Sequence, residues 1–319
     1  MAKLWPNPTA LHMSWFDSLA ASFIPLIPKS IMRRLSTRYI AGEKRADALE
    51  RGHRLARAGY RVTYDQLGEA VTNEAEVAAA VEENLRLLDD LKNGNLELNI
   101  STKPTQMGLN ISEQLCHDSM AKVLEKAQEY GAFVRFEMEE SFTVDGTLRV
   151  FEKLRAKFGS SVGVVLQSML FRTEEDARAL IASSDRPLNV RMVKGIYLEP
   201  DDVAYQEGSR VNDSYLRTLR VLLEGGAYVA AATHDDLLVA GLEQLLAENP
   251  SWRDKTEVQV LLGVREEMRQ HVRDSGLPVR VYVPYGEAWH KYVTRRLKRN
   301  PKLARHAFFG IFKRGERLN

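Results

Sequence analysis

The chain has 319 residues, of which 44% are hydrophobic and 28% are charged. This length and composition are typical of a folded globular protein and exclude a wholly disordered chain. The formal net charge is only +2 at pH 7, so charge gives no reason to expect nucleic acid as a partner. With one cysteine, Cys116, the chain cannot form an internal disulfide framework, and a reducing cytoplasmic compartment is expected.

The N-terminal part of the chain carries no clear targeting signal. No run of 18 apolar residues occurs, so no transmembrane helix is expected. The segment Leu19–Leu35 is apolar, but Pro25 and Pro28 interrupt it. We expect a helical N-terminal extension over residues 1–40, the main folded unit over 41–300 and a basic and aromatic tail over 301–319.

From about Tyr60 onward, apolar strand patterns alternate with helical ones. The expected strands are Tyr60–Asp65, Leu96–Thr102, Phe133–Met138, Gly163–Gln167, Leu188–Val193, Tyr228–Thr233, Glu257–Leu262 and Val279–Val283. Residues suited to begin helices are Asn73, Ser112 and Thr173, and glycines suited to end them are Gly94, Gly131 and Gly225. Eight such repeats predict an α/β protein with a (βα)8 TIM-like barrel, and an open doubly wound sheet is the alternative.

Several of these strands carry polar residues on one face, which is unusual for parallel strands that are covered on both sides. Side chains alternate along a strand, so Ser101 and Lys103 share one face, as do Arg135 and Glu137. Arg191, Gln167, Gln259 and Tyr282 lie in strands that are otherwise rich in Val and Leu. Polar side chains that point into a barrel, close to the carboxyl ends of its strands, predict a functional site there.

Other common sites have no support in the sequence. No GxGxxG or GxxxxGK[ST] motif is present, so a Rossmann or P-loop nucleotide site is not expected. No HExxH or comparable histidine cluster is present, so no metal site is predicted.

The segment Tyr285–Arg296, YGEAWHKYVTRR, places a tyrosine three residues before two adjacent arginines, a spacing that puts them on one helix face. This segment resembles the proline dehydrogenase family. Further family-like blocks occur in the expected order: TYDQLGE, TKPTQMG, VRFEMEES, VVLQSMLFRT, VRMVKGIY, AATHDD and VQVLLGV. The resemblance extends from about Arg38 to Arg299 and is typical of the monofunctional bacterial enzymes.

The resemblance implies a barrel whose last helix lies over the mouth, with FAD as cofactor. The enzyme would oxidise L-proline to 1-pyrroline-5-carboxylate and pass the electrons to a membrane quinone. The residues implied to contact the cofactor are Met138, Gln167, Arg191, Lys194, Gly195, Ile196, Tyr197, Thr233 and His234. Those implied to contact or gate the substrate are Glu69, Lys103, Tyr282, Tyr292, Arg295 and Arg296.

Two residues, Arg191 and Glu137, are expected to take part in the chemistry. Arg191 would lie near the reactive flavin nitrogen, and Glu137 is expected to form a polar pair with Lys103 that orients the substrate or handles its proton. The family commonly has aspartate at the position of Glu137 and glutamate at that of Arg299. The partners of these two side chains are therefore open.

Three other functions stay open. Hydroxyproline dehydrogenases commonly have a smaller residue at the position of Tyr292, so Tyr292 favours proline. A flavin-dependent barrel reductase acting on a folate-like substrate would not need the arginine pair, and a non-catalytic barrel would not retain the site residues.

The segments Trp15–Leu35 and 301–319 mix apolar and basic residues, which allows peripheral contact with the inner face of a membrane. The sequence predicts no oligomeric state.

Overall fold

A computed structural model of the chain describes residues 32–33, 36–68, 71–183, 185–290 and 292–294. The chain divides into two units, one formed by Arg38–Glu287 and one by the terminal segments Met1–Thr37 and Ala288–Asn319. The predicted site residues Glu69, Arg295 and Arg296 lie outside the described residues. The same holds for Arg299, for the tail over 301–319 and for most of the apolar N-terminal segment.

The unit Arg38–Glu287 is a closed barrel of eight parallel strands that neighbour one another in chain order, with β8 closing onto β1. The strands are β1 (Arg61–Gln66), β2 (Asn99–Thr102), β3 (Phe133–Phe136), β4 (Val162–Gln167), β5 (Asn189–Val193), β6 (Tyr228–Ala232), β7 (Thr256–Leu261) and β8 (Val279–Tyr285). The predicted barrel is confirmed, and the open sheet is excluded because β1 pairs with β8 over six residues.

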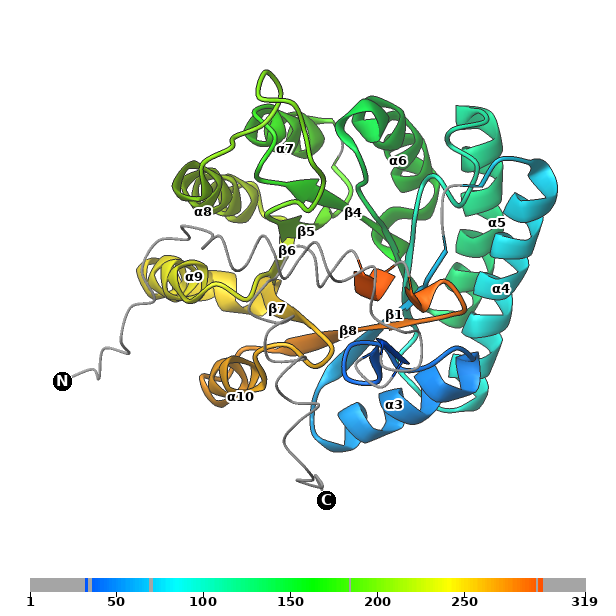
Figure 1. Cartoon of the computed structure of the whole chain (residues 1–319). Coiled ribbons are helices and arrows are strands. Elements are labelled where there is room, and N and C mark those ends of the chain that lie inside the picture. Colours follow the sequence, from blue (N-terminus) through cyan, green and yellow to red (C-terminus); the bar gives the residue numbers. More distant parts are fainter. Residues whose placement is uncertain (1–31, 34–35, 69–70, 184, 291, 295–319) are drawn as a thin grey trace. The chain divides into compact units, whose positions relative to one another are not determined.

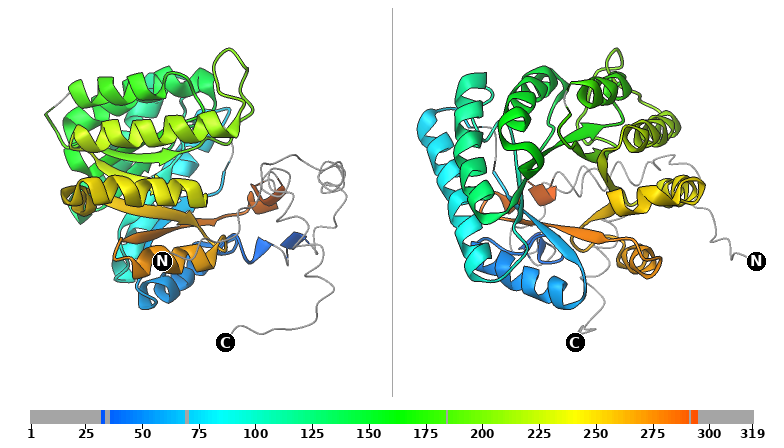
Figure 2. Two further views of the ribbon diagram at one scale, coloured as in Figure 1. Left: turned by 90° about the vertical axis from the view of Figure 1, so that its left-hand side faces the viewer. Right: turned by 180° about the vertical axis from the view of Figure 1, so that it is seen from behind.

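Helices surround this ring of strands, as Figure 1 shows in the view along the barrel and Figure 2 from the side. They are α3 (Arg45–Arg57), α4 (Glu74–Asn93), α5 (Glu113–Tyr130), α6 (Val144–Phe158), α7 (Thr173–Ala182), α8 (Gly208–Glu224), α9 (Asp236–Glu248) and α10 (Glu266–Asp274). Short 3-10 helices cover Ser141–Thr143, Gly159–Ser161 and Pro250–Lys255. None of the helices in the described part of the chain is long and apolar enough to span a membrane.

Most of the predicted helix ends are confirmed. Asn73 caps α4 by accepting a hydrogen bond from the Glu76 amide at 3.0 Å, and Ser112 caps α5 through the Leu115 amide at 3.0 Å. Gly131 ends α5 in the left-handed conformation with φ 68°. The prediction that Thr173 caps α7 is wrong, because Thr173 is the first residue of the helix and its hydroxyl donates to the Gln167 carbonyl instead.

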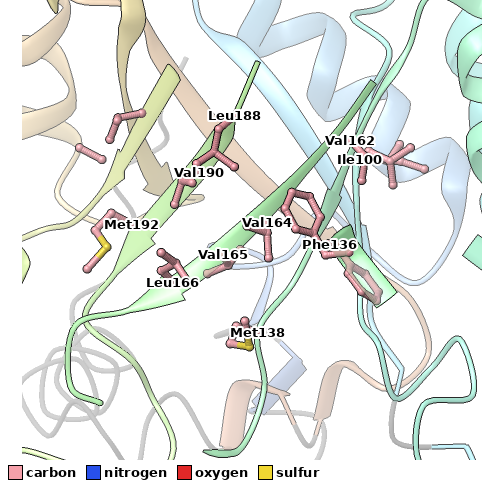
Figure 3. Packing of buried hydrophobic residues seen from close by; sticks show 14 of the residues in the cluster. Ile100, Phe136, Met138, Val162, Val164, Val165, Leu166, Leu188, Val190 and Met192 are labelled. Carbon is pink, nitrogen blue, oxygen red and sulfur yellow. The ribbon is translucent and has the colours of Figure 1, made fainter. Parts of the chain in front are cut away.

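The outer face of the strands is apolar and packs against the helices. Ile100, Val134, Val162, Val164 and Val190 are buried on this face and follow the strand register. Figure 3 shows Ile100, Val162, Val164 and Val190 among them. Cys116 on α5 belongs to the same core, and burial raises the pKa of its thiol, which agrees with a packing role.

The inner face of the strands is polar, as the alternation predicted. Neighbouring strands align Ser101 with Arg135 and Arg135 with Gly163, so these three residues point to the same side. A Cβ atom at Gly163 would lie 2.5 Å from the Arg135 guanidinium, so glycine here makes room for that large buried side chain. Arg135 in turn donates to the Val164 carbonyl at 3.1 Å and to the Asn189 carbonyl at 2.9 Å.

A buried ion pair, Glu257–Arg280, lies inside the barrel at the amino-terminal end of the strands. Glu257 accepts hydrogen bonds from Arg280 at 2.8 and 3.1 Å, from Tyr228 at 3.0 Å and from Gln259 at 2.6 Å. Arg280 also pairs with Glu97 at 2.8 Å. Burial alone would raise the pKa of Glu257, but Arg280 and the hydrogen bonds lower it to about 2.

We expect Glu257→Gln to lower the free energy of unfolding at pH 7 by about 3–5 kcal/mol, because the substitution leaves Arg280 without its main buried counter-charge. The carboxylate has a pKa near 4.5 when unfolded and about 2 when folded, so it stabilises the protein above pH 4.5 and loses this effect as the pH falls toward 2. Urea unfolding at pH 7 and pH 3 tests this.

The difference between wild type and Glu257→Gln should therefore shrink at pH 3. A matched control is Glu82→Gln, since Glu82 pairs with Arg86 at 2.7 Å on the exposed face of α4. Its loss should stay below about 1 kcal/mol at both pH values. An undiminished difference at pH 3 would contradict the role given to the charge of Glu257.

Candidate active site

Polar side chains gather at the carboxyl ends of the strands. Lys103 follows the last residue of β2, Glu137 follows that of β3, Gln167 ends β4 and Lys194 follows β5. Parallel strands place these ends at one face of the barrel, where barrel enzymes hold their reacting groups. The residues that the sequence selected therefore share one end of the barrel.

Arg191, on β5, is the centre of the hydrogen-bond network inside the mouth. Its side chain is 4% exposed. The guanidinium donates to the Glu137 carboxylate, to Gln259 Oε1 at 2.5 Å and to the Ser101 hydroxyl at 3.1 Å. Its central carbon also lies 5.2 Å from the centre of the Tyr282 ring. The Arg191 guanidinium is thus surrounded by side chains from β2, β7 and β8 and from the residue after β3.

A second ion pair lies beside this network. The Lys103 ammonium donates to both carboxylate oxygens of Asp65, at 2.6 and 2.8 Å. Burial alone would lower the pKa of Lys103, but Asp65 and the nearby carboxylates of Glu137 and Glu139 raise it. Lys103 is therefore a cation in the mouth of the barrel at neutral pH.

The direct partners differ from the predicted pairing of Lys103 with Glu137. Lys103 bonds to Asp65, whereas Glu137 bonds to Arg191, and Glu137 acts on Lys103 only through its charge. Glu137 follows β3 and reaches across to Arg191 on β5. The two cations are thus each neutralised by a separate carboxylate.

Two buried polar atoms lack a partner at the end of β4. Gln167 donates from Nε2 to the carbonyls of Met138 at 3.3 Å and Glu139 at 3.2 Å. Its Oε1 atom and the Ser168 hydroxyl are buried with no hydrogen-bond partner in the described structure. Buried polar atoms normally find partners, so these two atoms fit a bound polar group. The Met138 side chain itself belongs to the apolar core.

The β5–α8 loop begins with residues predicted to hold a cofactor. Lys194 pairs with Asp235 at 2.5 Å, and Ile196 is 44% exposed. Gly195 has φ 106°, and a Cβ atom there would lie 2.0 Å from the Met169 sulfur. This backbone position therefore requires glycine for two separate reasons.

The end of β6 is organised by Thr233 and His234. The Thr233 hydroxyl accepts from the Asp235 amide at 3.1 Å. His234 Nε2 accepts from the Leu261 amide at 3.0 Å, so in this arrangement the ring proton is carried by Nδ1. Tyr197 is half-buried in the loop after β5.

The structure thus brings Lys103, Glu137, Gln167, Arg191 and Tyr282 to one end of the barrel. It does not relate Tyr292 to them, because Tyr292 belongs to the other unit. Sequence reasoning missed Asp65, although this residue follows the same inward alternation along β1, and it assigned no role to Ser101 or Gln259 beyond polarity. Among the described residues, no group of His, Cys, Asp or Glu could hold a metal ion.

A closed (βα)8 barrel with paired charges at the carboxyl ends of its strands defines the class of (βα)8-barrel enzymes. Residues 48–306 match the model of the proline dehydrogenase family, so the chain belongs to that family. It is 38% identical over 257 residues to "Proline dehydrogenase 2" of Bacillus subtilis, covering 80% of this chain and 83% of that protein. It is 32% identical over 286 residues to "Proline dehydrogenase" of Deinococcus radiodurans, covering 88% and 91%.

The fold is also found in larger proteins. A crystal structure of proline utilization A from Bdellovibrio bacteriovorus, inactivated by N-propargylglycine, superposes with a TM-score of 0.80 at 22% sequence identity. The match covers 89% of this chain but only 37% of that protein. At this level of identity the comparison supports the barrel fold alone.

We expect Gly195→Ala to lower the free energy of unfolding by about 1–3 kcal/mol, because alanine is strained at φ 106° and its methyl group would displace Met169. Gly208, at the start of α8, is the control, since a Cβ atom there meets nothing within 4 Å. Gly208→Ala should change stability by less than about 1 kcal/mol. Urea unfolding of both variants decides; equal stability would show that Gly195 is not constrained.

Proposed function

We propose that the chain is a monofunctional FAD-dependent proline dehydrogenase that oxidises L-proline to 1-pyrroline-5-carboxylate. Membership of the family supports this reaction class. The observation that carries the proposal is the buried network around Arg191, which presents a fixed cation between a carboxylate and an aromatic ring at the barrel mouth. Unlike the structural pair Glu257–Arg280, this network includes a side chain, Glu137, that is 14% exposed at the end of the barrel where (βα)8 enzymes hold their reacting groups.

The residues at the mouth fit a flavin. The partnerless Gln167 Oε1 can accept a hydrogen bond from a ring N–H, and the Ser168 hydroxyl can bond to a ring or ribityl oxygen. Lys194 is 36% exposed and can contribute positive charge toward phosphate. We assign Met138, Gly195, Ile196, Tyr197, Thr233 and His234 to the walls of the same site. When bound, FAD would accept the hydride from the substrate.

Arg191 supplies the charge that this chemistry needs. A guanidinium held by Glu137, Gln259 and Ser101 cannot turn away, so its charge is organised before reaction. Fixed positive charge stabilises negative charge that develops beside it in the transition state. Glu137 orients the guanidinium.

The substrate carboxylate needs cations as partners. We propose that Lys103, Arg295 and Arg296 bind it, and that Tyr282 and Tyr292 exclude water from the pyrrolidine ring. Glu69 is proposed to pair with one of the two arginines and gate access. The ring nitrogen must be neutral before the C–N double bond forms, because its lone pair drives that step. Lys103, held as an ammonium by Asp65, is no acceptor for this proton.

We further propose a quinone as electron acceptor and a cytoplasmic protein that meets a membrane peripherally. The aromatic and basic tail over 301–319 and the N-terminal extension over 1–40 are the segments proposed for this contact. Flotation of the purified chain with liposomes, with and without proline, tests it. No flotation under either condition would reject the membrane contact without affecting the proposed reaction.

The purified protein should be yellow, and L-proline added without oxygen should bleach its flavin absorbance. An anaerobic visible spectrum before and after addition measures cofactor, substrate and direction of electron flow together. A flavin band that proline leaves unchanged would reject proline as substrate and favour hydroxyproline or a reductase substrate. A protein that stays colourless after reconstitution with FAD would reject the flavin.

The double variant Arg295→Ala, Arg296→Ala should bind proline about 100-fold more weakly, because two charge-assisted contacts to the carboxylate are lost. The KM for proline, with the flavin content of each preparation, measures this. Arg178→Ala is the control, since Arg178 pairs with Glu174 on the exposed face of α7. An unchanged KM in the double variant would reject the carboxylate clamp.

A further inference from the structure

Asp65, near the carboxyl end of β1, is a buried carboxylate that is not among the residues proposed to contact the substrate or the cofactor. Its side chain is 1% exposed. It stands in register with Ser101 on β2 and with Pro284 on β8, so it points into the barrel. A carboxylate buried this deeply is costly unless its charge is matched and its oxygens are bonded.

Both requirements are met by residues that the proposed reaction uses. Lys103 Nζ lies 2.6 Å from one oxygen of Asp65 and 2.8 Å from the other. The Tyr282 hydroxyl, on β8 at the other side of β1, also acts on the Asp65 carboxylate: burial raises the pKa of Asp65, and Lys103 and Tyr282 oppose this rise. One carboxylate thus holds Lys103 by two hydrogen bonds and interacts with Tyr282 on the strand at the other side of β1.

Few other charged groups face the Lys103–Asp65 ion pair. Besides Asp65, the groups that face Lys103 are Glu137 and Glu139 after β3. Asp65 itself faces Lys103, Glu137, Tyr282 and Tyr285. Arg191 lies across the mouth, bonded to Glu137. Only Asp65 makes a direct ion pair with Lys103 among the described residues.

We propose that Asp65 is a positioning residue, which anchors the Lys103 ammonium and the Tyr282 hydroxyl so that both side chains meet the substrate in a fixed geometry. This inference rests on the proposed function, because it takes the substrate to be an amino acid whose carboxylate binds beside Lys103. Asp65 does not touch the reacting atoms. It acts by keeping Lys103 charged and in place.

The first test needs no catalysis. Lys103 in the full-length protein is labelled competitively with acetic anhydride over a range of pH, and mass spectrometry follows its acetylation. In the wild type, labelling should begin only at high pH. In Asp65→Asn the midpoint should fall by about one pH unit or more, because a neighbouring carboxylate shifts a pKa by that amount and burial opposes the charge.

The second test separates positioning from a purely structural role. In Asp65→Asn, the KM for proline should rise about tenfold or more, while kcat changes less, because a charge-assisted contact with the carboxylate is weakened. The rise in KM should grow with pH as Lys103 loses its proton. Asp65→Glu keeps the charge, so it should leave Lys103 labelling near that of the wild type and restore part of the KM.

Thr63→Val is the matched control. Thr63 lies two residues earlier on the same inward face of β1, and its buried hydroxyl has no hydrogen-bond partner in the described structure. This variant should change neither labelling nor KM. If Asp65→Asn does not fold, Asp65→Glu carries the test, because moving the carboxylate by one methylene should still raise KM above that of the wild type.

Two outcomes would overturn the inference. The first is an Asp65→Asn protein with the wild-type labelling curve and KM. The second is an Asp65→Glu protein with a normal KM, together with an Asp65→Asn protein whose only defect is lower thermal stability. A wild type whose flavin is not reduced by proline rejects the proposed function instead. The labelling curves then still decide whether Asp65 holds Lys103 in its charged form.

Discussion

The alternation of side chains along eight parallel strands forces half of each strand into the closed interior of the barrel, and here much of that half is polar. Charges enclosed in this way must be paired, since an isolated buried charge is too costly to keep. Arg191 and Glu257 meet this requirement through oppositely charged partners from other strands or strand ends. Arg135 is held instead by neutral groups, the carbonyls of Val164 and Asn189, and burial lowers its pKa. Because these partners lie on different strands, the register of the strands fixes the positions of the paired side chains. This also holds at the carboxyl ends of the strands, where Arg191 lies.

The two ends of the barrel satisfy the same constraint in different ways. At the amino-terminal end of the strands, the side chains of Glu257 and Arg280 are 2% and 6% exposed and form an ion pair with each other. At the mouth, the side chains of Glu137 and Lys103 are 14% and 16% exposed, so each keeps some contact with solvent. A pair that is fully enclosed stabilises the fold, whereas one that is partly open can still act on a ligand. This difference fits the mouth as the place of reaction.

Sequence patterns predicted the fold better than the pairings within the site. The eight strands, the polar inner face and the caps at Asn73 and Ser112 follow from local rules that a single segment obeys. The partner of Lys103 does not, because Asp65 and Glu137 both lie at the inner face of strands next to β2. Their distances to the ammonium depend on strand tilt and stagger, which the sequence does not express. Thr173 was mistaken for a cap for a similar reason, since its hydroxyl bonds to the preceding β4 strand.

The β5–α8 loop shows how the mouth is kept in shape without regular structure. Its beginning is tied to the segment after β4 by the bond from the Met169 amide to the Lys194 carbonyl at 2.8 Å, and its end by the bond from the Tyr205 amide to the Met169 carbonyl at 2.8 Å. Between these ties, Glu199 accepts from the amide and hydroxyl of Ser141 at 2.8 and 2.5 Å. The loop is therefore fastened to the segments that follow β3 and β4.

Because the loop is fastened at three points, the backbone at Gly195 has little freedom to relax. Its φ is positive, and a Cβ atom added there would meet the Met169 side chain. A ligand site formed by such a loop would be organised before the ligand arrives, which would lower the entropy lost on binding. The same reasoning applies to Arg191 and Lys103, whose partners hold them in place. The charged side chains are thus fixed by polar partners inside the barrel, whereas the Gly195 backbone is fixed by bonds between the loops that follow its strands.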